Sequence, residues 1–243
     1  MGSKKDTLFA NPMAPLEFSF DENVAEVFED MINRSVPGYS TIISMIGLLA
    51  RQYCRTGSTV YDLGCSLGAA ATAILHQVPH RDYRLVAVDN SPAMIDRCRN
   101  KMELYQNDLP QIEILCQDIR STEITCASVV VMNFTLQFID IEDRAALLEH
   151  IYHGMEPGGI LILSEKIRFP DTTLDQLFID SYHNFKQRMG YSELEISRKR
   201  SALENVLLPE TIDSHKQRIL ASGFKTVDVW FQCFNFASLV AIK

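Results

Sequence analysis

The sequence lacks a long apolar run, a CxxC cysteine pair and an excess of basic residues. No apolar stretch in the 243 residues approaches the roughly 20 needed for a membrane-spanning helix. Its 23 basic and 31 acidic residues give a net charge of −8, which argues against a protein that binds duplex DNA through a basic surface. We therefore expect neither a membrane protein nor a direct nucleic-acid binder.

The cysteines and the N-terminus bear on the cellular compartment of the protein. Six cysteines are scattered at positions 54, 65, 98, 116, 126 and 233, and the first residues lack the apolar core of a signal peptide. Scattered cysteines without a secretion signal favour free thiols in a reducing environment. The sequence thus predicts a cytoplasmic protein.

The length and composition fit one globular domain, because 47% of residues are hydrophobic and 22% are charged. We expect a single domain over 1–243, with an N-terminal helical cap over 1–56 and a helical insertion over 171–208. Within the cap, Pro37 and Gly38 break two helical patterns. Tyr39 follows this break, so we expect it on a loop able to fold over a ligand.

The middle of the chain alternates short apolar runs with helical patterns, which predicts parallel strands joined by helices. We expect strands at 59–63, 84–89, 112–116, 128–133 and 159–166, and helices at 68–76, 92–104 and 142–155. The segment 156–159 should stop the third of these helices before the next strand. Helical patterns follow at 174–189, 193–206 and 211–222, and strands at 225–231 and 236–242 should pair antiparallel at one sheet edge.

A glycine-bearing turn follows the first predicted strand, and it is the central chemical feature. In the segment 60–68, Gly64 lets a ligand approach the backbone and Gly68 permits close strand–helix packing. The second strand ends at Asp89, where an acid can accept both hydroxyls of a ribose. A dinucleotide site would need a third glycine that is missing here. A tight turn without any ligand remains an alternative.

Polar residues also end the next two strands. Asp118, which precedes Ile119, follows the third strand, and Asn133 ends the fourth. Each one alone can be a capping residue, but together they predict a ligand site at the carboxyl edge of the sheet. The basic segment 197–201 contains Arg200, which would suit a carboxylate if it turned inward. For Arg198 and Lys199 a solvated basic face is the favoured interpretation.

Other candidates are weaker. Histidine pairs at 76/80 and 150/153 have helical spacing but no third ligand, so no metal site is expected. Cys65 lies in the turn without a neighbouring cation or histidine, and we do not predict a nucleophile there. We interpret the aromatic segment 230–236 as strand core or as a dimer interface. Stacking of these rings on nucleic-acid bases is a remote third alternative.

The pattern Asp62-x-Gly64-x-x-x-Gly68 resembles the first motif of S-adenosylmethionine (SAM)-dependent methyltransferases, so a Rossmann-like class I fold is implied. Nearly the whole chain resembles one family of that fold, the bacterial carboxy-S-adenosyl-L-methionine (carboxy-SAM) synthases. The most specific segments are Pro37-Gly-Tyr39, Gly190-Tyr-Ser and Lys199-Arg200. The resemblance is carried by residues 6–9, 20–28, 34–40, 62–69, 88–94, 133–138, 190–195, 199–205 and 230–236.

This resemblance implies that SAM and prephenate are the substrates and carboxy-SAM and phenylpyruvate the products, in the pathway that modifies the tRNA wobble uridine. It also implies a homodimer in which the partner subunit supplies the arginine. By the resemblance, Asp89 would take the ribose, Asp118 and Ile119 the adenine, and Arg200 the added carboxylate. The implied ligand contacts are Tyr39, Gly64, Cys65, Ser66, Asp89, Asn90, Asp118, Ile119, Asn133 and Arg200.

Two alternatives remain at this point: an ordinary small-molecule methyltransferase, and a non-catalytic nucleoside-binding scaffold. Arg200 separates the first from a carboxy-SAM synthase, because methyl transfer needs no cation beside the sulfonium methyl. The sequence does not identify the group that deprotonates this methyl.

Overall fold

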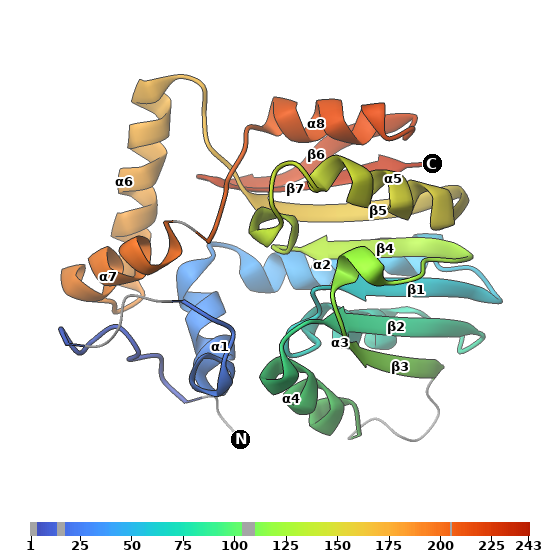
Figure 1. The fold of residues 1–243 in the computed structure, drawn as a ribbon, viewed down its shortest axis with the longest axis horizontal. Coiled ribbons are helices and arrows are strands. Elements are labelled where there is room, and N and C mark those ends of the chain that lie inside the picture. Colours follow the sequence, from blue (N-terminus) through green and yellow to red (C-terminus); the bar gives the residue numbers. More distant parts are fainter. Residues whose placement is uncertain (1–3, 14–17, 104–109, 205) are drawn as a thin grey trace.

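A seven-stranded sheet with the order β3-β2-β1-β4-β5-β7-β6 forms the centre of the molecule (Figure 1). The structure is a computed structural model that describes residues 4–13, 18–103, 110–204 and 206–243. The strands are β1 (Ser58–Leu63), β2 (Tyr83–Asp89), β3 (Gln111–Cys116), β4 (Ala127–Asn133), β5 (Met155–Lys166), β6 (Thr226–Cys233) and β7 (Phe236–Ile242).

The predicted mostly parallel sheet with an antiparallel edge pair is confirmed. Strands β3, β2, β1, β4 and β5 pair in parallel, whereas β7 runs antiparallel to both β5 and β6. All six residues of β1 are buried, as expected for a central strand covered on both faces. The largest error in a strand boundary concerns β5, which already begins at Met155, so the segment 156–159 lies inside a strand with an irregular register rather than before it.

Helices cover both faces of the sheet. On one face, α2 (Tyr39–Tyr53), α3 (Ala69–Gln77) and α4 (Pro92–Glu103) contribute to one core cluster. On the other, α5 (Arg144–Gly154) and α8 (Ile212–Ala221) pack in a second cluster. Alternate residues of one strand serve the two clusters, as Val129 and Val130 of β4 show. Residue 104, the predicted end of α4, lies outside the described residues.

The N-terminal helices begin at clear caps. Helix α1 (Glu22–Ser35) begins after Asp21, whose side chain accepts a hydrogen bond from the Val24 amide. Gly38, with φ of 78°, precedes α2 in the left-handed region that favours glycine. Tyr39 is therefore the first residue of a helix, and the predicted loop position was wrong. The break at Pro37 and Gly38 is real, but it lets the chain turn directly into α2.

Two further helices extend beyond one end of the sheet (Figure 1). They are α6 (Thr172–Arg188) and α7 (Glu193–Leu203), and α7 begins with a capping box between Ser192 and Glu195. The predicted continuous apolar face of α6 is split in the structure: Tyr182 is buried, while Leu174 and Leu177 are about half exposed, at 46% and 54%. The prediction of helix up to residue 206 was too long, and residue 205 lies outside the described residues.

The strand order places a topological switch between β1 and β4. From β1 the chain proceeds outward to β2 and β3, and then returns to β4 on the other side of β1. In such sheets, ligands bind in the crevice at the carboxyl ends of the strands beside the switch. No described helix is both long and apolar enough to cross a membrane.

Candidate functional site

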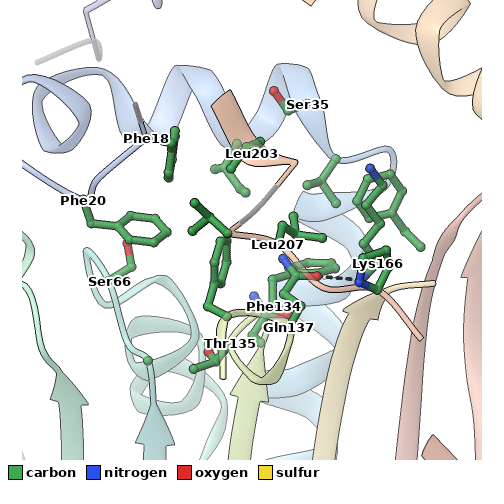
Figure 2. Close-up of a pocket in the computed structure, with 18 of the residues that line it drawn as sticks. Phe18, Phe20, Ser35, Ser66, Phe134, Thr135, Gln137, Lys166, Leu203 and Leu207 are labelled. Carbon is green, nitrogen blue, oxygen red and sulfur yellow. Dashed lines mark hydrogen bonds between the residues drawn. The ribbon is translucent and has the colours of Figure 1, made fainter. Parts of the chain in front are cut away.

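A cavity of about 600 Å³ lies at the carboxyl ends of the parallel strands (Figure 2). Its volume is in the range of small-molecule sites in proteins. Its walls come from the ends of β1, β2, β4 and β5, from the segment after β3, and from α1, α2, α6 and α7. It therefore lies where the switch of the sheet predicts a ligand.

All ten residues that the resemblance singled out line this one cavity. They come from six separate places in the chain, so their common location is a property of the fold rather than of local sequence. They are Tyr39, Gly64, Cys65, Ser66, Asp89, Asn90, Asp118, Ile119, Asn133 and Arg200.

The turn between β1 and α3 is held by backbone hydrogen bonds. The amides of Gly64 and Cys65 both donate to the Val88 carbonyl, at 2.8 and 2.9 Å. Gly64 has φ of 80°, and a Cβ built on it would lie 2.2 Å from Oγ1 of Thr135. Glycine is thus needed at position 64 because the loop after β4 approaches the turn closely. The cavity, which Gly64 also lines, is a second reason for a residue without a side chain.

Asp89 ties the turn to the start of α4. Its Oδ2 accepts from the Ser66 amide and its Oδ1 from the Ser91 amide, both at 2.9 Å. Burial raises the pKa of Asp89, and these backbone hydrogen bonds oppose the rise. Each carboxylate oxygen has a second lone pair, so Asp89 can still accept from the hydroxyls of a ribose.

Asp62 is a cavity residue that the sequence analysis did not include in the site. Its Oδ2 accepts from the Ala71 amide at 3.0 Å, in the first turn of α3, whose N-cap Gly68 has no side chain to do so. Burial raises the pKa of Asp62 to about 7, with a further contribution from Asp89. The strand pattern of β1 predicts that Asp62 is buried, but it does not show that Asp62 lines the cavity.

At the end of β3, Asp118 has a partner that the sequence analysis missed. Arg120 binds the Asp118 carboxylate with Nη2 at 2.6 Å and also reaches Asp143 with Nη1 at 2.6 Å. The side-chain hydrogen bond from Arg120 lowers the pKa of Asp118. Arg120 lines the cavity too, so this edge of the site is a charged pair with the carboxylate ionised at neutral pH.

Two groups in the cavity wall favour a nucleoside ligand. Oδ1 of Asn133, at the end of β4, is buried without a hydrogen-bond partner among the described residues. Aromatic rings surround the same space: the ring centroids of Phe20 and Phe138 lie 5.2 Å apart, edge to face, and those of Phe134 and Tyr39 lie 6.4 Å apart. Figure 2 shows Phe20 and Phe134 beside the cavity. The amide of Asn133 can hydrogen-bond to a polar atom of a nucleoside, and the aromatic rings can pack against its base and sugar.

The thiol of Cys65 is buried in the same wall. A hydrogen bond with Cys98 and burial raise the pKa of the Cys65 thiol well above its usual value. Such a thiol stays neutral at pH 7 and packs as a small apolar side chain.

The cations gather at the other end of the cavity. Arg200 is exposed on α7 and lines the cavity of its own chain, while Lys166, Lys186 and Lys199 are more buried. The solvated-face interpretation of Lys199 was wrong: its Nζ donates to Oγ of Ser35 at 3.0 Å and pairs with Asp6 at 3.5 Å. Burial lowers the pKa of Lys199 to about 7.

Arg198, the neighbour of Lys199, is only half exposed. Its Nη1 donates to the Pro12 carbonyl at 2.5 Å, so it fastens the N-terminal segment to α7. No group of three or more histidine, cysteine, aspartate or glutamate side chains in the described part of the chain is placed to hold a metal ion.

Comparisons with known proteins define the class of this fold. The family model for a methyltransferase domain matches residues 60–159. Human N-acetylserotonin methyltransferase, solved with SAM, superposes with a TM-score of 0.59 at 15% identity, covering 91% of this chain and 55% of that one. A magnesium protoporphyrin IX methyltransferase from Synechocystis superposes at 0.56 with 16% identity, covering 84% and 82%. The fold is that of the Rossmann-like SAM-dependent methyltransferases.

The sequence relatives are more specific. A carboxy-S-adenosyl-L-methionine synthase of Haemophilus ducreyi is 55% identical over 98% of each chain, and one of Aliivibrio fischeri is 57% identical over 98% of each. The chain belongs to the carboxy-S-adenosyl-L-methionine synthase family. It is an enzyme of methyltransferase fold that uses SAM.

Proposed function

We propose that the enzyme converts SAM and prephenate into carboxy-SAM and phenylpyruvate, and so supplies the carboxymethyl donor for the tRNA wobble uridine. The observation that carries this proposal is one cavity with Asp89 and Asp118 toward one end and a group of cations toward the other, of which only Lys199 has an ion-pair partner among the described residues. An ordinary methyltransferase needs the acidic end for the nucleoside. The cations suit a product that differs from SAM by a carboxylate on the methyl carbon.

The ligand contacts follow from the residues in the wall. Asp89 would accept the ribose hydroxyls, and Asp118 with Ile119 would hold the adenine. Arg200 would pair with the carboxylate of the product, because a guanidinium binds a carboxylate through two parallel hydrogen bonds. Tyr39, Gly64, Cys65, Ser66, Asn90 and Asn133 would complete the contacts with the nucleoside and the sulfonium.

The reaction balances without any further reagent. The sulfonium acidifies its methyl group, and loss of a proton gives an ylide. Prephenate loses its ring carboxylate as carbon dioxide and its ring hydroxyl as hydroxide, which leaves the aromatic phenylpyruvate. The ylide carbon bonds to the carbon dioxide, and the hydroxide takes up the methyl proton to give water. Water from solvent would quench the ylide, so the apolar wall of Phe20, Phe134 and Phe138 serves to exclude it.

The surroundings of the reaction are part of the same proposal. We propose a homodimer that acts in the cytoplasm, with SAM and prephenate as its small-molecule substrates and carboxy-SAM as its product. It would bind neither nucleic acid directly nor a membrane, in keeping with the net charge of −8. A different enzyme would then transfer the carboxymethyl group to tRNA.

Mass spectrometry of a turnover mixture tests the reaction. Purified protein with SAM and prephenate should form a nucleoside heavier than SAM by about 44 mass units, the mass of added carbon dioxide, together with phenylpyruvate. Omission of prephenate is the matched control and should give no such product. If SAM stays intact in both mixtures, the scaffold alternative holds. Appearance of S-adenosylhomocysteine with a methylated acceptor would instead indicate an ordinary methyltransferase.

A further inference from the structure

Two lysines at the cationic end of the cavity share one aromatic ring. Lys166 ends β5 and Lys186 lies in the last turn of α6, and their Nζ atoms lie 5.3 and 4.5 Å from the ring centroid of Tyr182. Lys186 is only 4% exposed. All three side chains line the cavity, and Lys166 is visible at its edge in Figure 2.

Neither ammonium has a carboxylate within ion-pair distance among the described residues, in contrast to Lys199. Asp6, the acid whose charge acts on Lys186, is already occupied. One of its oxygens accepts from the Leu8 amide, and the other accepts from the Tyr191 hydroxyl and pairs with Lys199. A cation–π contact offsets only part of the cost of burying an ammonium ion. The pair is therefore prepared for an anion that comes from outside the chain.

The basic groups around the pair add to its field. His183 and Arg200 line the same end of the cavity, and the charge of Arg200 acts on both Lys166 and His183. Burial is the main cause that lowers the pKa of both Lys166 and Lys186, the latter to about 8, so Lys186 stays largely protonated at pH 7. An anion bound between the two lysines would favour their charged forms further.

The lysines lie away from the acids that suit the nucleoside. Asp89 ends β2 and Lys166 ends β5, and the order β2-β1-β4-β5 puts three strand spacings, roughly 14 Å, between these two positions. An anion held by Lys166 and Lys186 is therefore separate from the ribose end. It lies toward Arg200, whose charge acts on Lys166 and which is expected to receive the transferred carboxylate.

We propose that Lys166 and Lys186, which share the ring of Tyr182, bind a carboxylate of the second substrate, namely the carboxylate that stays on the donor when the other is transferred. This inference rests on the proposed function. A donor with two carboxylates must place one beside the sulfonium methyl, near Arg200. Its second carboxylate then needs a cation other than Arg200. Lys166 and Lys186 supply two cations at this end of the cavity.

Two variants test the assignment: Lys186→Met and Lys166→Met. Methionine replaces each buried ammonium with an apolar chain of similar length, so the variants should fold as stably as the parent protein. With SAM saturating, each should raise the KM for prephenate by about tenfold or more, the loss expected for a charge-assisted hydrogen bond. The Kd for SAM, measured by calorimetry, should change by less than about twofold. Lys186→Arg, which keeps the charge, should recover part of the loss.

The matched control is Arg188→Met, which removes one positive charge from an exposed position on the same helix, outside the cavity. It should leave the KM for prephenate and the Kd for SAM unchanged. An unchanged KM for prephenate in both lysine variants would overturn the proposal. A Kd for SAM weakened to the same extent would also overturn it, because the pair would then hold the carboxylate of SAM itself.

Direct binding separates this proposal from the proposed function. Prephenate is titrated by calorimetry into protein saturated with S-adenosylhomocysteine, which has no methyl group to react. If the parent protein forms no carboxy-SAM but binds prephenate, and Lys186→Met abolishes that binding, the anion subsite holds and the proposed reaction is wrong. If the parent protein makes carboxy-SAM and Lys186→Met binds prephenate as tightly, the reaction holds and the subsite is wrong. No binding to the parent protein would overturn the subsite as well as the donor.

Discussion

At the scale of single residues, Arg200 is the residue that we expect to decide which ligand the cavity prefers. SAM and carboxy-SAM differ only by a carboxylate on the methyl carbon, and Arg200 lines the cavity. Arg200 is exposed on α7, so water screens part of its interaction. The expected effect is therefore that of a charged hydrogen bond rather than of a fully buried ion pair.

We expect Arg200→Ala to weaken the binding of carboxy-SAM by about 1.5–3 kcal/mol and that of SAM by much less. Arg200→Lys should recover part of the difference, because an ammonium cannot reproduce the two parallel bonds of a guanidinium. Calorimetric titration of both ligands gives the ratio of the two affinities. Arg198→Ala, next to Arg200 but outside the cavity, is the control and should keep the ratio. The same ratio in Arg200→Ala and the parent protein would contradict the assignment.

The site residues that could be predicted from sequence are those that end a strand. Asp89 and Asn133 end β2 and β4, and parallel strands bring their carboxyl ends to one edge whatever the details of packing. Lys166 also ends a strand, but its proposed role in binding an anion depends on Lys186 and Tyr182. These two come from α6, and nothing local in the sequence says against which end of the sheet α6 packs.

At the scale of elements, α8 carries a buried histidine with consequences for acid stability. His215 is 1% exposed, and neither of its ring nitrogens has a hydrogen-bond partner among the described residues. Burial lowers the pKa of His215 from its usual 6.5 to about 4, while Glu210 opposes and Arg218 and Arg144 add to the shift. The folded protein thus keeps this ring neutral where the unfolded chain would protonate it.

The sign of the pH effect follows from proton binding. Between pH 6.5 and about 4 the unfolded chain binds a proton at His215 that the folded protein does not, so folding becomes less favourable as the pH falls through this window. His215→Leu removes the penalty. The parent protein should lose on the order of 2 kcal/mol more unfolding free energy than this variant between pH 8 and pH 5, as measured by urea denaturation.

An exposed histidine on α5 provides the control: His153→Leu removes a histidine without touching the α8 packing. If His215→Leu and the parent protein lose stability in parallel between pH 8 and pH 5, the ring is not held neutral in the folded state. A loss of stability in His215→Leu at pH 8 alone would instead report on packing, since both forms of the protein are neutral at that site there.

Elements with simple periodicity could be predicted closely, and those whose ends depend on neighbours could not. The central strands are continuous apolar runs, and β2 and β4 end as expected at Asp89 and Asn133. Strand β5 begins early, at Met155, because its first residue pairs with Ala127 of β4 across an irregular register. The residue pattern of 155–166 alone does not reveal that Ala127 pairs with Met155 and so lengthens the strand.

At the scale of the whole molecule, the exposed face of α6 is the surface at which we expect the proposed homodimer to form. Leu174 and Leu177 are 46% and 54% exposed on a helix that extends beyond the sheet (Figure 1). Two neighbouring exposed leucines on a projecting helix are a candidate contact surface, which dimer formation would cover. The sequence predicts the apolar stripe of α6, but only the fold shows that its N-terminal half is left uncovered.

We expect the parent protein to have twice the chain mass of 27.6 kDa in light scattering at micromolar concentration. The double variant Leu174→Arg/Leu177→Arg should be monomeric, because two copies of a C2 interface would bring four buried positive charges together. Leu220→Arg on α8 is the matched control: Leu220 is equally exposed, at 47%, but lies on another part of the molecule, and the variant should remain dimeric.

The monomeric variant also shows which subunit supplies Arg200 to the site. In the structure Arg200 lines the cavity of its own chain, whereas the family resemblance implies that it comes from the partner subunit. If the partner supplies it, the double variant should lose the preference for carboxy-SAM over SAM to the same extent as Arg200→Ala, although its own Arg200 is intact. If the chain supplies its own Arg200, the monomer should keep the preference, and the dimer would then serve stability rather than the site. A parent protein that is monomeric and fully active at nanomolar concentration would contradict the homodimer altogether.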